Sequence, residues 1–112
     1  MRAIILWINL LCLALFAGCR LSDERVTVIK TPGVHNENCA KIVSKALEPL
    51  RGIKSEELSF DYNAGTVTVR YDSMQLARKN IELAIAGAGF AANEIPADQK
   101  AQAALPPECK LP

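Results

Sequence analysis

The stretch PGVHNENCAKIV, residues 32–43, contains the side chain best placed to do chemistry, the thiol of Cys39. This cysteine stands where a loop of proline, glycine and asparagine residues gives way to a helical pattern. A thiol in the first turn of a helix lies at the positive end of the helix dipole, which favours the thiolate. Thiolates bind soft metal ions, but one sulfur alone does not hold such an ion against competing ligands. Cys39 therefore needs a partner, unless it is only a small apolar residue on the helix face with Ile42 and Val43.

Cys109 is the main candidate for that partner. The chain has four cysteines, and Cys12 and Cys19 belong to an N-terminal segment that has the pattern of an export signal. The two that remain can form a disulfide or act as two ligands of one ion, and the sequence leaves both alternatives open. His35 is a candidate auxiliary nitrogen ligand, although a loop histidine beside asparagines is commonly only solvated.

The N-terminal segment has the pattern of an export signal. A single positive charge, Arg2, precedes an apolar run that ends in LFAGC at Cys19. The run is shorter than the roughly 20 apolar residues that a spanning helix needs, and the small residues before Cys19 fit a cleavage site. LFAGC resembles a bacterial lipobox, which implies a lipoprotein signal peptide over residues 1–18 and a lipidated Cys19; ordinary secretion is the alternative.

This resemblance also implies a location. Arg20 follows the cysteine where an aspartate would retain a lipoprotein in the inner membrane. We therefore expect a lipid anchor on the periplasmic face of the bacterial envelope, with the outer membrane favoured over the inner. Disulfides can form in that compartment.

Charge and motifs exclude several classes of function. The chain has 13 basic and 12 acidic residues, and removal of the signal peptide takes away Arg2, so the mature protein is close to neutral. No basic field for nucleic acid is present. The sequence contains no nucleophile paired with a base, no carboxylate pair and no phosphate-binding loop, so we do not expect an enzyme.

The elements that must position Cys39 follow from hydrophobic periodicity. Alternation of apolar and polar residues predicts strands, and apolar residues three or four positions apart predict helices. NAG at residues 63–65 is the expected hairpin turn. Asp72 and Ser73 are expected to cap the second helix. The expected order is strand 26–30, helix 39–50, strands 56–62 and 66–71, helix 77–88 and strand 90–95. This βαββαβ order predicts an α+β, ferredoxin-like sandwich with two helices on one face of a four-stranded antiparallel sheet.

The expected division of the chain is a signal peptide at 1–18, a tether at 19–25, a domain at 26–95 and a C-terminal tail at 96–112. In this topology the last strand ends at the pole opposite Cys39. The tail would then have to cross a domain roughly 25 Å wide, and its length is just sufficient to bring Cys109 to Cys39.

Residues 26–95 resemble the heavy-metal-associated domain of copper chaperones and mercury-binding proteins. GVHNENC, LEPLRGI and AIAGAGF stand at the spacings of the family's first loop and its two helix ends. That loop carries Gly-Met-x-Cys-x-x-Cys in the family, whereas here Val34 replaces the methionine and Asn36 the first cysteine. Only Cys39 carries over as a ligand, so the metal motif is degenerate.

The resemblance implies that the protein binds or transfers a soft d10 ion such as Cu(I). The expected ligands are Cys39 and Cys109, with His35 as an auxiliary, and the expected partners are the metal ion, the membrane through Cys19, and a periplasmic metal-transport protein. The alternative is a metal-free structural or adaptor module in which Cys39 and Cys109 form a disulfide.

Overall fold

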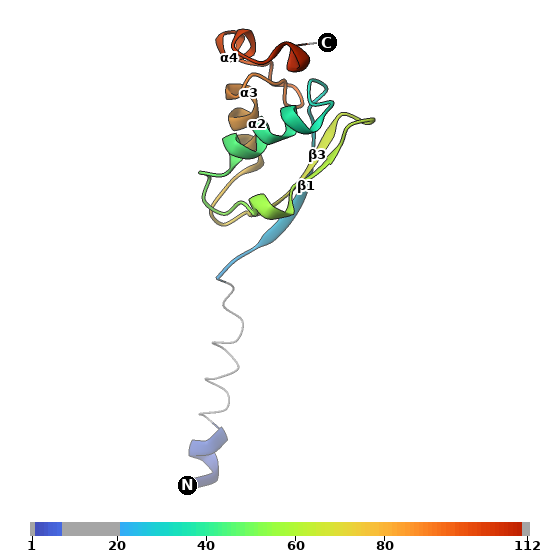
Figure 1. The fold of residues 1–112 in the computed structure, drawn as a ribbon. Helices are drawn as coiled ribbons and strands as arrows, with labels where there is room; N and C mark the ends of the chain where they lie inside the picture. Colours follow the sequence, from blue (N-terminus) through green and yellow to red (C-terminus); the bar gives the residue numbers. More distant parts are fainter. Residues whose placement is uncertain (1, 8–20, 111–112) are drawn as a thin grey trace.

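The computed structural model describes residues 2–7 and 21–110, and the folded domain begins at β1 (Figure 1). The cysteines Cys12 and Cys19, with the expected cleavage site, lie outside the described residues. No helix in the described part of the chain is long and apolar enough to cross a bilayer. The elements are β1 (Glu24–Lys30), α2 (Glu37–Leu47), η1 (Ser55–Glu57), β2 (Ser59–Asp61), β3 (Thr66–Asp72), α3 (Arg78–Gly87), α4 (Gln99–Ala103) and η2 (Pro107–Cys109).

The strands form an antiparallel sheet in the order β1-β3-β2. β1 and β3 pair along their whole length, with Thr27 opposite Val69, and β2 pairs with the first half of β3. Side chains alternate between the faces of a strand, so Ile29, Val67 and Val69 point together into the core and are fully buried. The helices α2 and α3 cover this face of the sheet (Figure 1).

Both helices present an apolar stripe to the sheet. α2 buries Val43 and Leu47, and α3 buries Ile81 and Ile85. The predicted cap of this helix at Asp72 and Ser73 is wrong, because Asp72 accepts a hydrogen bond from the Met74 N–H in a turn before the helix. The N-cap of α3 is Ala77, whose N–H donates to the side chain of Asn80. The α+β architecture with two helices on one face of an antiparallel sheet agrees with the sequence prediction.

The predicted fourth strand is wrong. Ala92 and Ile95 exchange two hydrogen bonds, each 2.9 Å long, and close a tight turn around Asn93, whose φ is 52°. Asparagine tolerates this left-handed conformation better than most residues. Among the described residues of β1 only Lys30, the last one, bonds to the turn: its N–H donates to Asn93 Oδ1 and its carbonyl accepts from the Asn93 N–H. Asn93 Nδ2 also donates to Glu82 Oε1 on α3. The sheet therefore has three strands.

The same turn changes the predicted route of the tail. Because the chain reverses beside the end of β1, the tail starts at the pole that also holds the first loop, and it never crosses the domain (Figure 1). The N–H of Asp98 donates to the carbonyl of Ala86, and Leu105 is buried in the main core. The tail is thus a packed part of the domain at the pole where Cys39 lies.

Candidate functional site

Cys39 is held by the start of α2. Asn36 is the N-cap residue, with an extended backbone, and its side-chain oxygen accepts a hydrogen bond of 3.0 Å from the N–H of Cys39. An asparagine at this position satisfies one of the N–H groups that a helix leaves without an internal partner. Cys39 therefore occupies the third position of the helix, with its side chain completely buried.

Cys109 reaches this site through the tail. Its N–H donates to the carbonyl of Pro106, the residue before η2, and the buried Leu105 anchors the chain just before that. A second link joins the tail to α2 directly, since Asn38 Nδ2 donates to Glu108 Oε1 at 2.9 Å. The tail is therefore held by the core at Leu105 and by the first turn of α2 at Glu108, both just before Cys109.

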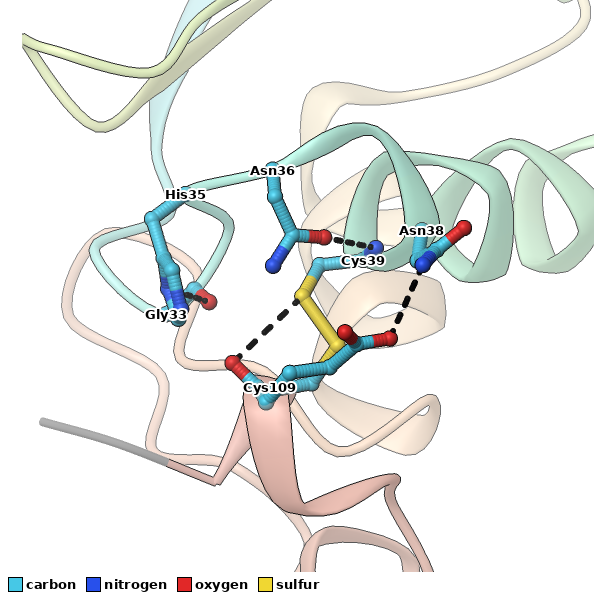
Figure 2. Close-up of a disulfide and its surroundings, with 7 residues drawn as sticks. Gly33, His35, Asn36, Asn38, Cys39 and Cys109 are labelled. Carbon is cyan, nitrogen blue, oxygen red and sulfur yellow. Dashed lines mark hydrogen bonds between the residues drawn. A yellow bond between two sulfur atoms is a disulfide. The ribbon is translucent and has the colours of Figure 1, made fainter.

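The two cysteines form a disulfide, with their Cα atoms 5.7 Å apart (Figure 2). This separation lies within the range that bonded cysteines adopt. Cys39 Sγ also lies 4.0 Å from the carbonyl oxygen of Glu108. We regard this as a contact and not as a hydrogen bond, because a disulfide sulfur has no proton to donate. Both cysteines are buried, so the bond is shielded from bulk solvent.

A hollow of about 300 Å³ borders the disulfide on the side of Cys109. It lies between the first loop, the end of α3 and the tail, and it is lined by Pro32, Gly33, Gly89, Phe90, Ala91, Gln102 and Cys109.

His35 does not join the cysteines. Its side chain is exposed, and its ring turns toward Gly33 and away from the disulfide (Figure 2). The ring Nδ1 lies 2.9 Å from the Gly33 carbonyl, which can only accept, so Nδ1 is the donor of this hydrogen bond. Among the described residues no group of three or more histidine, cysteine, aspartate or glutamate side chains is arranged to hold a metal ion. The role of His35 as a ligand stays a prediction.

Sequence reasoning missed what Asn36 and Val34 do. It treated each only as a replacement for a metal-loop residue, whereas Asn36 caps α2 and Val34, 2 % exposed, packs in the core. The capping role was available from the sequence, because an asparagine just before a helical apolar pattern is a strong N-cap signal. The Asn38–Glu108 bond had no such local signal.

The oxidation state of the pair decides which chemistry is available. In the disulfide both sulfurs are bonded to each other, so neither is a thiolate that can bind a metal ion. After reduction, two thiols would remain on backbone positions 5.7 Å apart. Two metal–thiolate bonds of about 2.3 Å span at most about 4.6 Å between sulfurs, which side chains attached at these positions can reach.

The fold and the site define the class of protein. Residues 28–91, more than half of the chain, match the family model of the heavy-metal-associated domain, and the chain belongs to this family. No curated protein sequence matches the chain.

Solved structures of three proteins are similar to it. Oxidized MerP from Ralstonia metallidurans CH34 is 18% identical, with a TM-score of 0.57, over 63% of this chain and 96% of that one. The CopZ metallochaperone is 24% identical, with a TM-score of 0.56, over 61% of this chain and 98% of its own. A copper binding domain from HMA7, a P-type ATPase, is 25% identical, with a TM-score of 0.55, over 67% of this chain and 97% of that one. These likenesses confirm the ferredoxin-like fold, although the sheet in the described residues has three strands.

Proposed function

We propose that this protein is an exported, non-enzymatic heavy-metal-associated domain that binds a soft d10 ion, with Cu(I) the leading candidate, when Cys39 and Cys109 are reduced. The observation that carries the proposal is the meeting of these two sulfurs at the N-terminus of α2. The tail supplies the second sulfur, in place of the first cysteine that the family's loop would provide at residue 36. His35 is proposed only as an auxiliary ligand, which would have to swing away from Gly33.

Membership of the family supports heavy-metal binding in general. The similar CopZ is named a metallochaperone and the HMA7 domain a copper binding domain, which makes Cu(I) the first ion to test here. Transfer to a periplasmic metal-transport protein is part of the proposal, because the site lies at one pole of the domain and a partner can approach that pole.

We also propose that Cys19 is lipidated and anchors the protein on the periplasmic side of the outer membrane. The support is the LFAGC sequence and Arg20. β1 starts at the end of the domain opposite the disulfide, so a tether attached there would leave the Cys39 pole directed away from the bilayer (Figure 1).

A metal-free adaptor is the second candidate, and two observations favour it. Asn36 caps the helix in the place where a ligand would stand, and the disulfide that occupies both sulfurs is buried. In this reading the disulfide only fastens the tail to the domain.

Metal binding to the reduced chain distinguishes the two candidates. The full chain is prepared with Cys12→Ser and Cys19→Ser, so that only the two proposed ligands remain, and is titrated with Cu(I) against a competing chelator. We expect about one Cu(I) per reduced chain and none on the oxidised chain, because soft ions need the thiolate pair. Native mass spectrometry gives the stoichiometry.

Single substitutions test each ligand. Cys39→Ser and Cys109→Ser should each remove most of the affinity, whereas His35→Gln should weaken binding only slightly. Strong binding that survives Cys39→Ser would eliminate the proposed site. If the reduced parent protein binds no better than the Cys39→Ser/Cys109→Ser variant, the adaptor is the better description.

A further inference from the structure

The outer edge of β1 carries backbone groups that the fold leaves without a strand partner. The Thr31 N–H donates to the Gly65 carbonyl at 2.7 Å, so the odd-numbered residues of β1 form their backbone hydrogen bonds with β3. The backbone N–H and carbonyl groups of the even-numbered residues therefore point away from β3, toward the open edge. Lys30 follows this rule, because its N–H and carbonyl both bond to Asn93 on the outer side. Within residues 21–110 nothing bonds to the outward groups of Val26 and Val28.

The side chains at this edge are also unusual for an open surface. Val26 and Val28 are 54% and 56% exposed, on the sheet face that the helices do not cover. A strand edge that combines free backbone groups with exposed β-branched residues is a template for another strand. The predicted fourth strand would have covered this edge, and the turn at Ala92–Ile95 leaves it open.

Charges on the same face make β1 complementary to itself. The outward face reads Glu24, Val26, Val28 and Lys30, with an acid at one end, a base at the other and two valines between them. An antiparallel copy of this strand places the acidic end of each copy near the basic end of the other, with the valines between them. Opposite charges and β-branched side chains on neighbouring strands are both favourable pairs.

Asn93 restricts the register of such pairing. It already occupies the position beside Lys30, so a second β1 cannot extend over that residue. The register centred on Val26 avoids it, because Val26 then faces its own copy and Glu24 faces Val28. Glu24 of one copy then lies diagonally across from Lys30 of the other, within reach of long side chains.

We propose that two copies of this chain associate through their β1 strands, antiparallel and about a two-fold axis at Val26, to form one continuous six-stranded sheet. The contact is isologous, so it closes on itself and leads to a dimer and not to a fibre. Glu24 also binds Lys54 of its own chain at 2.7 Å. In the dimer its carboxylate would contact both this lysine and Lys30 of the second copy. The interface lies on the edge of β1 and does not involve the cysteines.

Cysteine crosslinking tests the register. Val26→Cys and Val28→Cys are introduced separately into the full chain with Cys12→Ser and Cys19→Ser, in detergent, after peptide mapping shows that Cys39–Cys109 is intact. In the proposed register the two copies of residue 26 are about 5.5 Å apart, within disulfide range, and those of residue 28 are about 14 Å apart. We expect at least about tenfold more crosslinked dimer from Val26→Cys.

The oligomeric state gives an independent measurement. Val26→Lys should abolish the dimer in light scattering, because two lysines would face each other at the axis. Leu83→Lys is the matched control, since Leu83 is an equally exposed aliphatic residue, 52%, on α3, and it should leave the dimer intact. A monomer at all concentrations, preferential crosslinking through Val28→Cys, or equal loss of the dimer in the control would overturn the proposal.

Discussion

The side-chain oxygen of Asn36 accepts a hydrogen bond from the N–H of Cys39, 3.0 Å away, at the start of α2. Asn36 stands at the position where the resemblance would place the first metal-loop cysteine. The backbone of the loop is therefore organised around a cap, and the second sulfur comes from the tail, 70 residues further along the chain. A short-range motif has been replaced by a long-range contact.

Loss of the cap should destabilise the domain by a measurable amount. Asn36→Ala removes the acceptor for the Cys39 N–H, and we expect the free energy of unfolding to fall by about 1 kcal/mol. Asn36→Asp keeps an acceptor oxygen and should retain most of the stability. Urea denaturation of the oxidised proteins gives the values. Equal stability of the parent and Asn36→Ala would mean that the cap contributes nothing.

Removal of the disulfide should have a larger effect. The bond closes a loop of 70 residues, and the chain-entropy model gives about 4 kcal/mol for a loop of this length. A single core of this size supplies only about 3–5 kcal/mol, so Cys39→Ala/Cys109→Ala should be marginally stable. Denaturation of this variant, compared with oxidised and reduced parent protein, measures the contribution. Coincident unfolding curves for all three would show that the tail is held without the bond.

Gly89 tests whether the tail packs as described. Its φ is 106°, and a Cβ at this position would lie 2.9 Å from the backbone nitrogen of Gln102. Gly89→Ala should therefore lower the free energy of unfolding by about 1–3 kcal/mol. Gly87→Ala is the matched control, because a Cβ there meets nothing within 4 Å, and it should be neutral or slightly stabilising. If the two variants behave alike in thermal unfolding, the tail does not pack on Gly89.

Asp72 should contribute a pH dependence to stability. The N–H groups of Asp23 and Met74 donate to its carboxylate and lower the pKa of Asp72 below the ordinary aspartate value. The unfolded chain then takes up the proton first, so the stabilisation is present above about pH 4 and is lost as the pH falls through the lowered pKa.

Melting temperatures measured against pH check this expectation. The difference between the parent and Asp72→Asn should shrink as the medium becomes acidic, while Glu48→Gln, at an exposed position after α2, should follow the parent. A difference between the parent and Asp72→Asn that stays constant from about pH 7 to about pH 3 would contradict it.

Lipidation is tested at Cys19. Expression in a bacterial host with a labelled fatty acid should label the parent protein, and Cys19→Ser should abolish both the label and partitioning into detergent. Cys12→Ser is the control, because Cys12 would lie inside the removed signal peptide. A parent protein without label would leave ordinary secretion as the route of export.

The sequence alone determined the features that depend on local pattern. Alternating β-branched residues in β1 and β3, and apolar spacing in α2 and α3, specify elements whose buried faces can only meet in a two-layer sandwich. The resemblance of three short stretches identified the family, and the expected roles of Cys12 and Cys19 in a signal peptide and an anchor made Cys109 the predicted partner of Cys39.

Only the tertiary structure decided how that partner arrives. Residues 90–95 have the composition of a strand, yet Asn93 takes a left-handed conformation and bonds to Lys30, so the chain turns back at the pole of Cys39. Local periodicity cannot predict this, because the turn depends on Lys30, 63 residues away, whose N–H donates to Asn93 Oδ1. The contact between Lys30 and Asn93 thereby leaves the sheet without a fourth strand, leaves the edge of β1 open and keeps the tail at the pole where Cys109 meets Cys39. Each of these features depends on contacts between residues that are far apart in the sequence.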